Sequence, residues 1–125
     1  PYVKLANNLA GWNFDWDWTE QAQFTKYGLN EHYGWHCDSY SEPYQDVPQG
    51  MVGKIRKLSV TVSLSDPEDY EGGDLEFLGT QIKQEEFRQQ GTCIIFPSFL
   101  AHKVSKVKSG TRYAIVGWVH GPTYK

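Results

Sequence analysis

A strict alternation of side chains between residues 57 and 64 constrains the fold of this 125-residue chain more than any other feature. Aliphatic and hydroxyl residues take turns there, with Leu58, Val60, Val62 and Leu64 in one set and Ser59, Thr61 and Ser63 in the other. A period of two is typical of a strand that buries one face and leaves the other polar. The segment therefore predicts a half-buried strand within a sheet.

Other short segments have the same character, and turn residues separate them. We expect strands over residues 23–27, 33–38, 74–78, 92–96, 101–107 and 111–120, and an extended aromatic strand within residues 2–20. Gly72–Gly73 and residues 108–110 are typical of tight turns, and residues 81–90 are the one expected helix. Many short strands with turns between them indicate an all-β sandwich or barrel. The predicted fold class is an all-β core, a jelly roll or double-stranded β-helix, with a minor helix.

Length and composition exclude several classes of protein. A chain of 125 residues most simply forms one domain, here spanning residues 1–125. The net charge of −3 and the lack of a basic stripe argue against a nucleic-acid partner. The longest apolar runs, such as Cys93 to Phe96, are far too short to span a membrane. With no signal-peptide pattern at its start, we expect a cytoplasmic protein in which Cys37 and Cys93 are buried, reduced thiols.

Two histidines and a carboxylate form the first candidate site. His36 and Asp38 are two residues apart, so on a strand both side chains project from one face while Cys37 projects from the other. His102 lies on a different predicted strand and would complete the set. Two imidazoles and one carboxylate are typical of a non-haem Fe(II) centre with open coordination positions, whereas a closed set of thiolates would indicate structural zinc.

Arg112 begins the last predicted strand and forms the second candidate site. Every second residue of that strand shares its face, namely Ala114, Val116 and Trp118. Burying an arginine without a partner is costly, and a guanidinium binds a carboxylate through two parallel hydrogen bonds. Arg112 therefore implies an anionic ligand in a pocket, or else an internal acid, for which Asp74 and Glu76 are the candidates.

The segment from Ser39 to Lys54 has little periodicity and contains several proline and glycine residues. A connection of this length without regular structure is usually functional or disordered. Because it follows two candidate ligands directly, we expect a lid or a substrate loop. The remaining histidines, His32 and His120, have no partners in the pattern and are expected on the surface or at an interface.

Three stretches of the chain resemble a known family. They are residues 57–67 (KLSVTVSLSDP), residues 70–75 (YEGGDL) and residues 96–114, which contain FP, HKV and GTRYA in that order. These stretches are similar to the prolyl-4-hydroxylase-like branch of the 2-oxoglutarate/Fe(II) dioxygenases, and the likeness runs from about Phe24 to Trp118.

The resemblance implies a role for each site residue. The residues that would hold iron are His36, Asp38 and His102. Arg112 would bind the distal carboxylate of 2-oxoglutarate, and Tyr27 would contact the co-substrate or line its pocket. Leu75 and Trp118 would form part of the pocket wall. One position departs from the family, because Ser63 stands where some prolyl hydroxylases have a second tyrosine that binds the co-substrate.

The resemblance also implies an activity, which is hydroxylation of a C–H bond with Fe(II), 2-oxoglutarate and O₂, giving succinate and CO₂. Ascorbate is a further candidate cofactor, and a prolyl residue in a peptide or protein is the expected substrate. A free amino acid, a small metabolite or a nucleobase stays open as the substrate, as does a non-catalytic, cupin-like module that binds a metal or a carboxylate. The N-terminal helices that usually brace the sheet in this family are expected to be reduced to the segment before Phe24.

Overall fold

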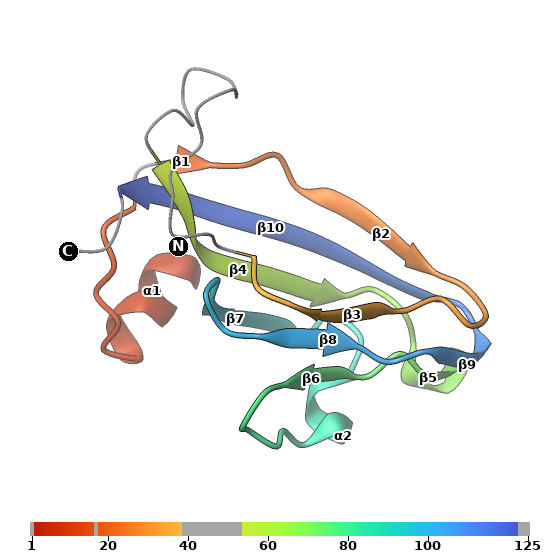
Figure 1. Cartoon of the computed structure of the whole chain (residues 1–125). Coiled ribbons are helices and arrows are strands. Elements are labelled where there is room, and N and C mark those ends of the chain that lie inside the picture. Colours follow the sequence, from red (N-terminus) through yellow and green to blue (C-terminus); the bar gives the residue numbers. More distant parts are fainter. Residues whose placement is uncertain (1, 17, 39–53, 123–125) are drawn as a thin grey trace.

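The computed structural model describes residues 2–16, 18–38 and 54–122, which form two main sheets and a few short helices (Figure 1). The helices are α1 (Tyr2–Leu9), the 3-10 helix η2 (Pro67–Asp69) and α2 (Gln84–Phe87). The strands are β1 (Trp18–Thr19), β2 (Gln23–Tyr27), β3 (Tyr33–His36), β4 (Lys54–Ser63), β5 (Tyr70–Gly72), β6 (Leu75–Phe77), β7 (Cys93–Pro97), β8 (His102–Val104), β9 (Val107–Gly110) and β10 (Arg112–Pro122). Apart from Lys54, the predicted loop over residues 39–54 lies outside the described residues.

The larger sheet has five strands, and the long strand β10 runs through it. Strands β2 and β1 lie along one side of β10, and β4 followed by β7 lies along the other (Figure 1). In the register, Arg112 stands opposite Tyr27 on β2, and Trp118 stands opposite Ser59 on β4. Directly opposite residues of antiparallel strands project from the same face of a sheet. Each of these two cross-strand pairs, which we call rungs, therefore places two side chains next to each other.

The smaller sheet has three strands in the order β3-β8-β6, and β5 pairs with β9 in a separate ribbon. All of the strand pairings within the described part of the chain are antiparallel. Antiparallel strands with few helices confirm the predicted all-β sandwich of jelly-roll type.

Strand β4 confirms the strand predicted from the alternation, but its polar positions are not exposed to solvent as expected. Leu58 is fully buried, as expected for an aliphatic position. Ser59 is also buried, and together with Thr61 it lines a cavity between the sheets. At Ser59 and Thr61 the polar side of the strand therefore faces an internal pocket and not bulk water.

The first twenty residues are not the extended strand that the alternating rings predict. Residues 2–9 form helix α1, and strand structure in this segment is confined to β1. Leu5 and Ala6 favour a helix intrinsically. The buried Asn7 then fixes the chain beyond the helix, because its amide donates to the Phe14 carbonyl oxygen and accepts from the Phe14 N–H, both at 2.9 Å. This tertiary contact is invisible to a pattern of alternation.

Two further local predictions are wrong in extent or type. The helix expected over residues 81–90 is limited to α2. The guanidinium of Arg88, just after α2, donates hydrogen bonds to the carbonyl oxygens of Gly72 and Tyr70. The expected turn at residues 108–110 is part of β9, which pairs with β5 so that Gly110 stands opposite Tyr70. Gly72 and Gly73 do have the positive φ angles, 74° and 61°, that a tight turn requires.

Both cysteines are free, but the prediction that they are buried is wrong, because each is exposed. Cys37 lies between two residues whose side chains face the pocket, so alternation turns it outward. Cys93 begins β7, which is an edge strand of the larger sheet. In the described part of the chain, no helix has the length and apolar character needed to cross a membrane.

Candidate active site

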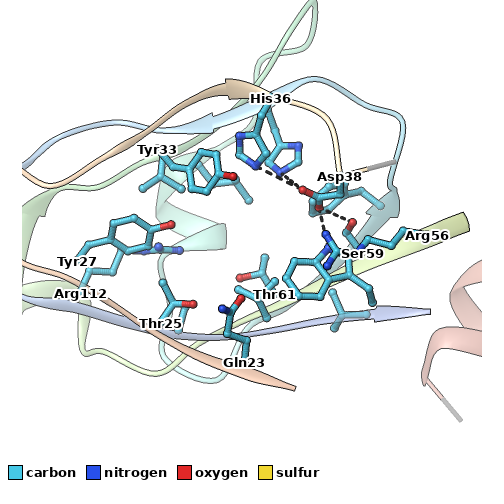
Figure 2. Close-up of a pocket in the computed structure, with 18 residues that line it drawn as sticks. Gln23, Thr25, Tyr27, Tyr33, His36, Asp38, Arg56, Ser59, Thr61 and Arg112 are labelled. Carbon is cyan, nitrogen blue, oxygen red and sulfur yellow. Dashed lines mark hydrogen bonds and ion pairs between the residues drawn. The ribbon is translucent and has the colours of Figure 1, made fainter. Parts of the chain in front are cut away.

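A cavity of about 380 Å³ lies between the two main sheets, and it contains the residues of both predicted sites (Figure 2). The larger sheet contributes Tyr27, Ser59, Arg112 and Trp118 to its lining, among others. The smaller sheet and the turn after β3 contribute His36, Asp38, Leu75 and His102. Figure 2 shows Arg112 and Tyr27 at one end of the cavity and Asp38 at the other.

The structure brings His36, Asp38 and His102 together as the sequence predicts. His36 ends β3 and stands opposite His102, which begins β8. The Nε2 atoms of His36 and His102 lie 3.4 and 3.5 Å from Asp38 Oδ1. One candidate ligand atom from each residue lies within 4.8 Å of the others, which is compact enough to surround a single ion.

Backbone contacts turn both imidazoles so that Nε2 faces the centre of this group. The Nδ1 atom of His36 lies 2.7 Å from the Gly34 carbonyl oxygen, and that of His102 lies 2.9 Å from the Leu100 carbonyl oxygen. A carbonyl oxygen can only accept a hydrogen bond, so each Nδ1 carries a proton and, in the neutral ring that binds a metal, Nε2 offers its lone pair. Metal-binding histidines are commonly oriented in this way. The donor set therefore fits a divalent metal.

Asp38 is buried and ionised. Burial alone would raise the pKa of its carboxyl group, but hydrogen bonds from His102, Ser59 and Trp118 outweigh this effect and lower the pKa to about 2. Ser59 Oγ donates to Asp38 Oδ2 at 2.6 Å, and Trp118 Nε1 donates to the same oxygen at 3.0 Å. The site thus supplies one anionic ligand at any pH near neutrality.

Arg112 is 6% exposed and faces the cavity. The internal acids that could have bound it have other partners, because Asp74 binds Arg88 at 2.8 Å and Glu76 binds Lys103 at 3.7 Å. Among the residues that the structure describes, no carboxylate lies within ion-pair distance of Arg112. The buried guanidinium is therefore directed toward a pocket that can admit an anion.

Tyr27, Leu75 and Trp118, the three other predicted pocket residues, all line the cavity. The Arg112 guanidinium carbon lies 5.5 Å from the centre of the Tyr27 ring. Burial raises the pKa of the Tyr27 phenol, although Arg112 acts in the opposite direction. Ser63 is not among the lining residues, and its hydroxyl donates to the Phe87 carbonyl oxygen.

Several lining residues were not predicted from the sequence. The ring of Tyr33 lies over the His36 imidazole, with 3.7 Å between ring centroids. Gln23, Thr25, Arg56, Ser59 and Thr61 supply further polar groups. For Ser59 and Thr61 the signal was present, since they occupy the polar positions of the alternating strand.

His120 is a correction to the predictions, because it is fully buried and not on the surface. Its Nε2 atom lies 3.5 Å from Glu20 Oε1, and the Glu20 carboxylate also binds Arg56 at 3.2 Å. The Arg56 guanidinium in turn stacks 3.8 Å above the Trp118 ring. His32, by contrast, is exposed as expected.

The metal-free protein is expected to lose stability on acidification partly through His120. Burial lowers the pKa of His120 below 6.5, and Arg56 and Lys54 act in the same direction, while Glu20 opposes them. Below pH 6.5 the unfolded chain therefore binds a proton that the folded chain still excludes, and the free energy of unfolding falls. Urea unfolding between pH 7.5 and 5.5 should show a shallower decline for His120→Asn than for the native chain. The exposed His32→Asn variant is the control, and equal declines in all three proteins would contradict the assignment.

The family model described as the 2OG-Fe(II) oxygenase superfamily matches residues 22–120, which contain every residue of the site. The chain belongs to that superfamily. The sequence motifs predict membership of the same superfamily.

Curated relatives of the chain include PKHD-type hydroxylases of Picosynechococcus sp. and Prochlorococcus marinus, which are 38% and 41% identical over 96 and 99 residues. The matches cover 77% and 78% of this chain but 40% of each relative. The chain thus spans about two fifths of the length of these relatives.

Solved structures of other proteins share the fold. The viral collagen prolyl hydroxylase from Paramecium Bursaria Chlorella virus-1, in its 2OG complex, matches with a TM-score of 0.69 and 24% identity, covering 96% of this chain and 68% of that one. A prolyl-4-hydroxylase of Pseudomonas putida matches with a TM-score of 0.66 and 19% identity, covering 99% of this chain and 62% of that one.

Proposed function

We propose that this chain is the catalytic core of an Fe(II)- and 2-oxoglutarate-dependent dioxygenase that hydroxylates a C–H bond. One observation carries the proposal. A histidine–aspartate–histidine group and a buried arginine without a carboxylate partner among the described residues line the same cavity. The first is a typical ligand set for non-haem iron, and the second matches the distal carboxylate of 2-oxoglutarate.

Iron would be held by Nε2 of His36, Nε2 of His102 and the carboxylate of Asp38. When bound together with 2-oxoglutarate and O₂, the metal supplies the oxidising power to hydroxylate an unactivated C–H bond, with succinate and CO₂ as co-products. Ascorbate is proposed only as a reductant that maintains the ferrous state. Three protein ligands leave the remaining coordination positions to the co-substrate and O₂.

The residues of the chain itself position the reactants. Arg112 binds the distal carboxylate, with the Tyr27 ring beside its guanidinium. Leu75, Val104 and Val116 line the same cavity, so apolar side chains cover part of the space that the co-substrate would occupy. Because a charge-assisted hydrogen bond gains strength where water is excluded, these side chains make the carboxylate contact tighter and more directional.

The proposed substrate is a prolyl residue of a peptide or protein. Two kinds of relative support it, since the curated proteins are named PKHD-type hydroxylases and the solved structures are named prolyl hydroxylases. A free amino acid or a small metabolite would use the same chemistry. A nucleobase within nucleic acid fits less well, given the net charge of −3. A non-catalytic, cupin-like binding module has less support, because the ligand set and the arginine are both complete.

Anaerobic addition of 2-oxoglutarate to the Fe(II)-loaded chain should produce a weak metal-to-ligand charge-transfer band in the visible spectrum. The band reports simultaneous binding of the keto acid to iron, so it requires the intact ligand set. His102→Ala is expected to abolish it, while His32→Asn, which alters an exposed histidine, should retain it. A folded, iron-bound native chain without the band would contradict the co-substrate assignment and favour the binding module.

A further inference from the structure

The two oxygens of the Asp38 carboxylate have different surroundings. Oδ1 faces both imidazoles, at 3.4 Å from His36 Nε2 and 3.5 Å from His102 Nε2. Oδ2 accepts hydrogen bonds from Ser59 Oγ at 2.6 Å and from Trp118 Nε1 at 3.0 Å. A carboxylate oxygen has about two lone-pair sites, so both sites on Oδ2 are already used.

The two donors to Oδ2 lie on one rung of the larger sheet. Ser59 on β4 and Trp118 on β10 are cross-strand partners, so their side chains project from the same face. Neither donor lies on the strands that carry the histidines, because His36 and His102 belong to the smaller sheet. Asp38 is therefore the ligand through which the larger sheet is joined to the metal site.

A further layer of contacts holds each donor in place. An ionised carboxylate can only accept, so Ser59 donates to Asp38 and must accept from the Ser98 hydroxyl, which lies 2.9 Å away and is fully buried. The backbone of Ser98 also joins Asp38 to strand β4. Its carbonyl oxygen accepts a hydrogen bond from the Asp38 N–H, and its N–H donates to the Lys57 carbonyl oxygen. On the other side, the Arg56 guanidinium stacks on the Trp118 ring at 3.8 Å and is itself bound by Glu20.

We propose that Ser59 and Trp118 are positioning residues that lock the Asp38 carboxylate, so that it offers the metal Oδ1 alone. Ser98 and Arg56 hold these two donors at their rung. The inference rests on the proposed role of His36, Asp38 and His102 as a metal site. It goes beyond that role, because it assigns a function to two residues whose hydrogen bonds are to Asp38 and not to a metal or a co-substrate. A carboxylate that offers one oxygen would occupy a single coordination position and leave more positions for 2-oxoglutarate and O₂.

The test is binding of Co(II), followed by competition titration and by the visible spectrum of the bound ion, in the full chain without 2-oxoglutarate. Ser59→Ala removes one donor and is expected to weaken Co(II) binding roughly tenfold to a hundredfold, the usual effect of losing a partner of a metal ligand. Trp118→Phe keeps a ring for Arg56 but removes the N–H, and should act in the same direction. Both variants should also alter the Co(II) spectrum, because the freed Oδ2 allows two-oxygen coordination.

Two controls separate positioning from folding. Ser59→Thr keeps the hydroxyl and should restore native affinity and spectrum. Ser63→Ala removes another buried serine hydroxyl of β4, one that bonds to the Phe87 carbonyl oxygen outside the cavity, and should leave both readouts unchanged. Circular dichroism and the thermal midpoint of the metal-free proteins verify that each variant is folded.

The outcomes are distinct for the two proposals. Native affinity and an unchanged spectrum in folded Ser59→Ala and Trp118→Phe, with binding abolished in His102→Ala, would overturn the positioning role and leave the metal site intact. An equal loss in Ser63→Ala would also overturn it, since the effect would then be one of general stability. Failure of the native chain to bind Co(II) would overturn the proposed function and the positioning role together.

Discussion

Asp38→Ala is expected to lower the rate of Fe(II)-dependent conversion of 2-oxoglutarate to succinate by more than about a hundredfold. Loss of a residue that only hydrogen-bonds to a metal ligand costs up to about a hundredfold, and loss of the ligand itself should cost more. The variant removes the only anionic member of the ligand group. It also leaves Ser59 and Trp118, which donate to this carboxylate, without their acceptor. The measurement is succinate produced per enzyme at saturating iron and 2-oxoglutarate, together with Fe(II) affinity by titration.

A conservative replacement sharpens this first prediction. Asp38→Glu keeps the charge but moves the carboxylate by one methylene, away from the rung that holds it, so activity should stay far below the native value. Asp69→Ala, which removes an exposed carboxylate, is the matched control and should behave like the native chain. Undiminished succinate formation in folded Asp38→Ala would show that the carboxylate is not a ligand.

Arg112→Ala is expected to raise the concentration of 2-oxoglutarate needed for half-maximal turnover by at least about a hundredfold. Each charge-assisted hydrogen bond contributes on the order of 1.5–3 kcal/mol net, and a guanidinium makes two of them to a carboxylate. Arg112→Lys keeps the charge without the planar fork and should fall between alanine and the native residue. Steady-state kinetics against 2-oxoglutarate, at saturating iron, measures the effect.

Iron binding distinguishes this loss from general damage. Arg112 lies at the far end of the cavity from Asp38, so Fe(II) affinity without 2-oxoglutarate should be close to native in Arg112→Ala (Figure 2). Lys26→Ala, which removes an exposed cation from the neighbouring strand, should change neither quantity. An unaltered requirement for 2-oxoglutarate in Arg112→Ala would mean that the buried guanidinium serves only the fold.

The candidate metal ligands and Arg112 could be picked out from the sequence because local rules govern which way their side chains point. His36 ends strand β3 and Asp38 follows two residues later, and both line the cavity. Alternation along β10 puts Arg112 and Trp118 on one face. The bounds predicted for one strand, Gln23–Tyr27, match β2 for the same reason. Where side-chain periodicity decides orientation, the sequence alone was a sufficient guide.

The remaining features depend on contacts between distant segments. Helix α1 is followed by a turn that Asn7 fixes through Phe14, and no alternation reveals this. His120 lies beside Glu20 and Arg56, which come from two segments that are distant from it in the sequence. The polar positions of β4 indicate that this side of the strand does not pack against an apolar core. Periodicity does not tell whether such a side faces solvent or an internal cavity. Ser59 was missed as a pocket residue for this reason.

The register of β10 has a consequence for the choice of co-substrate. From Arg112 to Trp118 the strand advances roughly 20 Å, at about 3.4 Å per residue. One end of this interval holds a guanidinium, and the other end is tied through Trp118 to the carboxylate of Asp38. An extended backbone that is hydrogen-bonded on both sides cannot shorten or stretch as a loop can, so β10 fixes the separation of Arg112 and Trp118. With 2-oxoglutarate bound as proposed, a dicarboxylate one methylene shorter or longer would lose its contact with either Arg112 or the metal, and selectivity for chain length would be a property of the backbone.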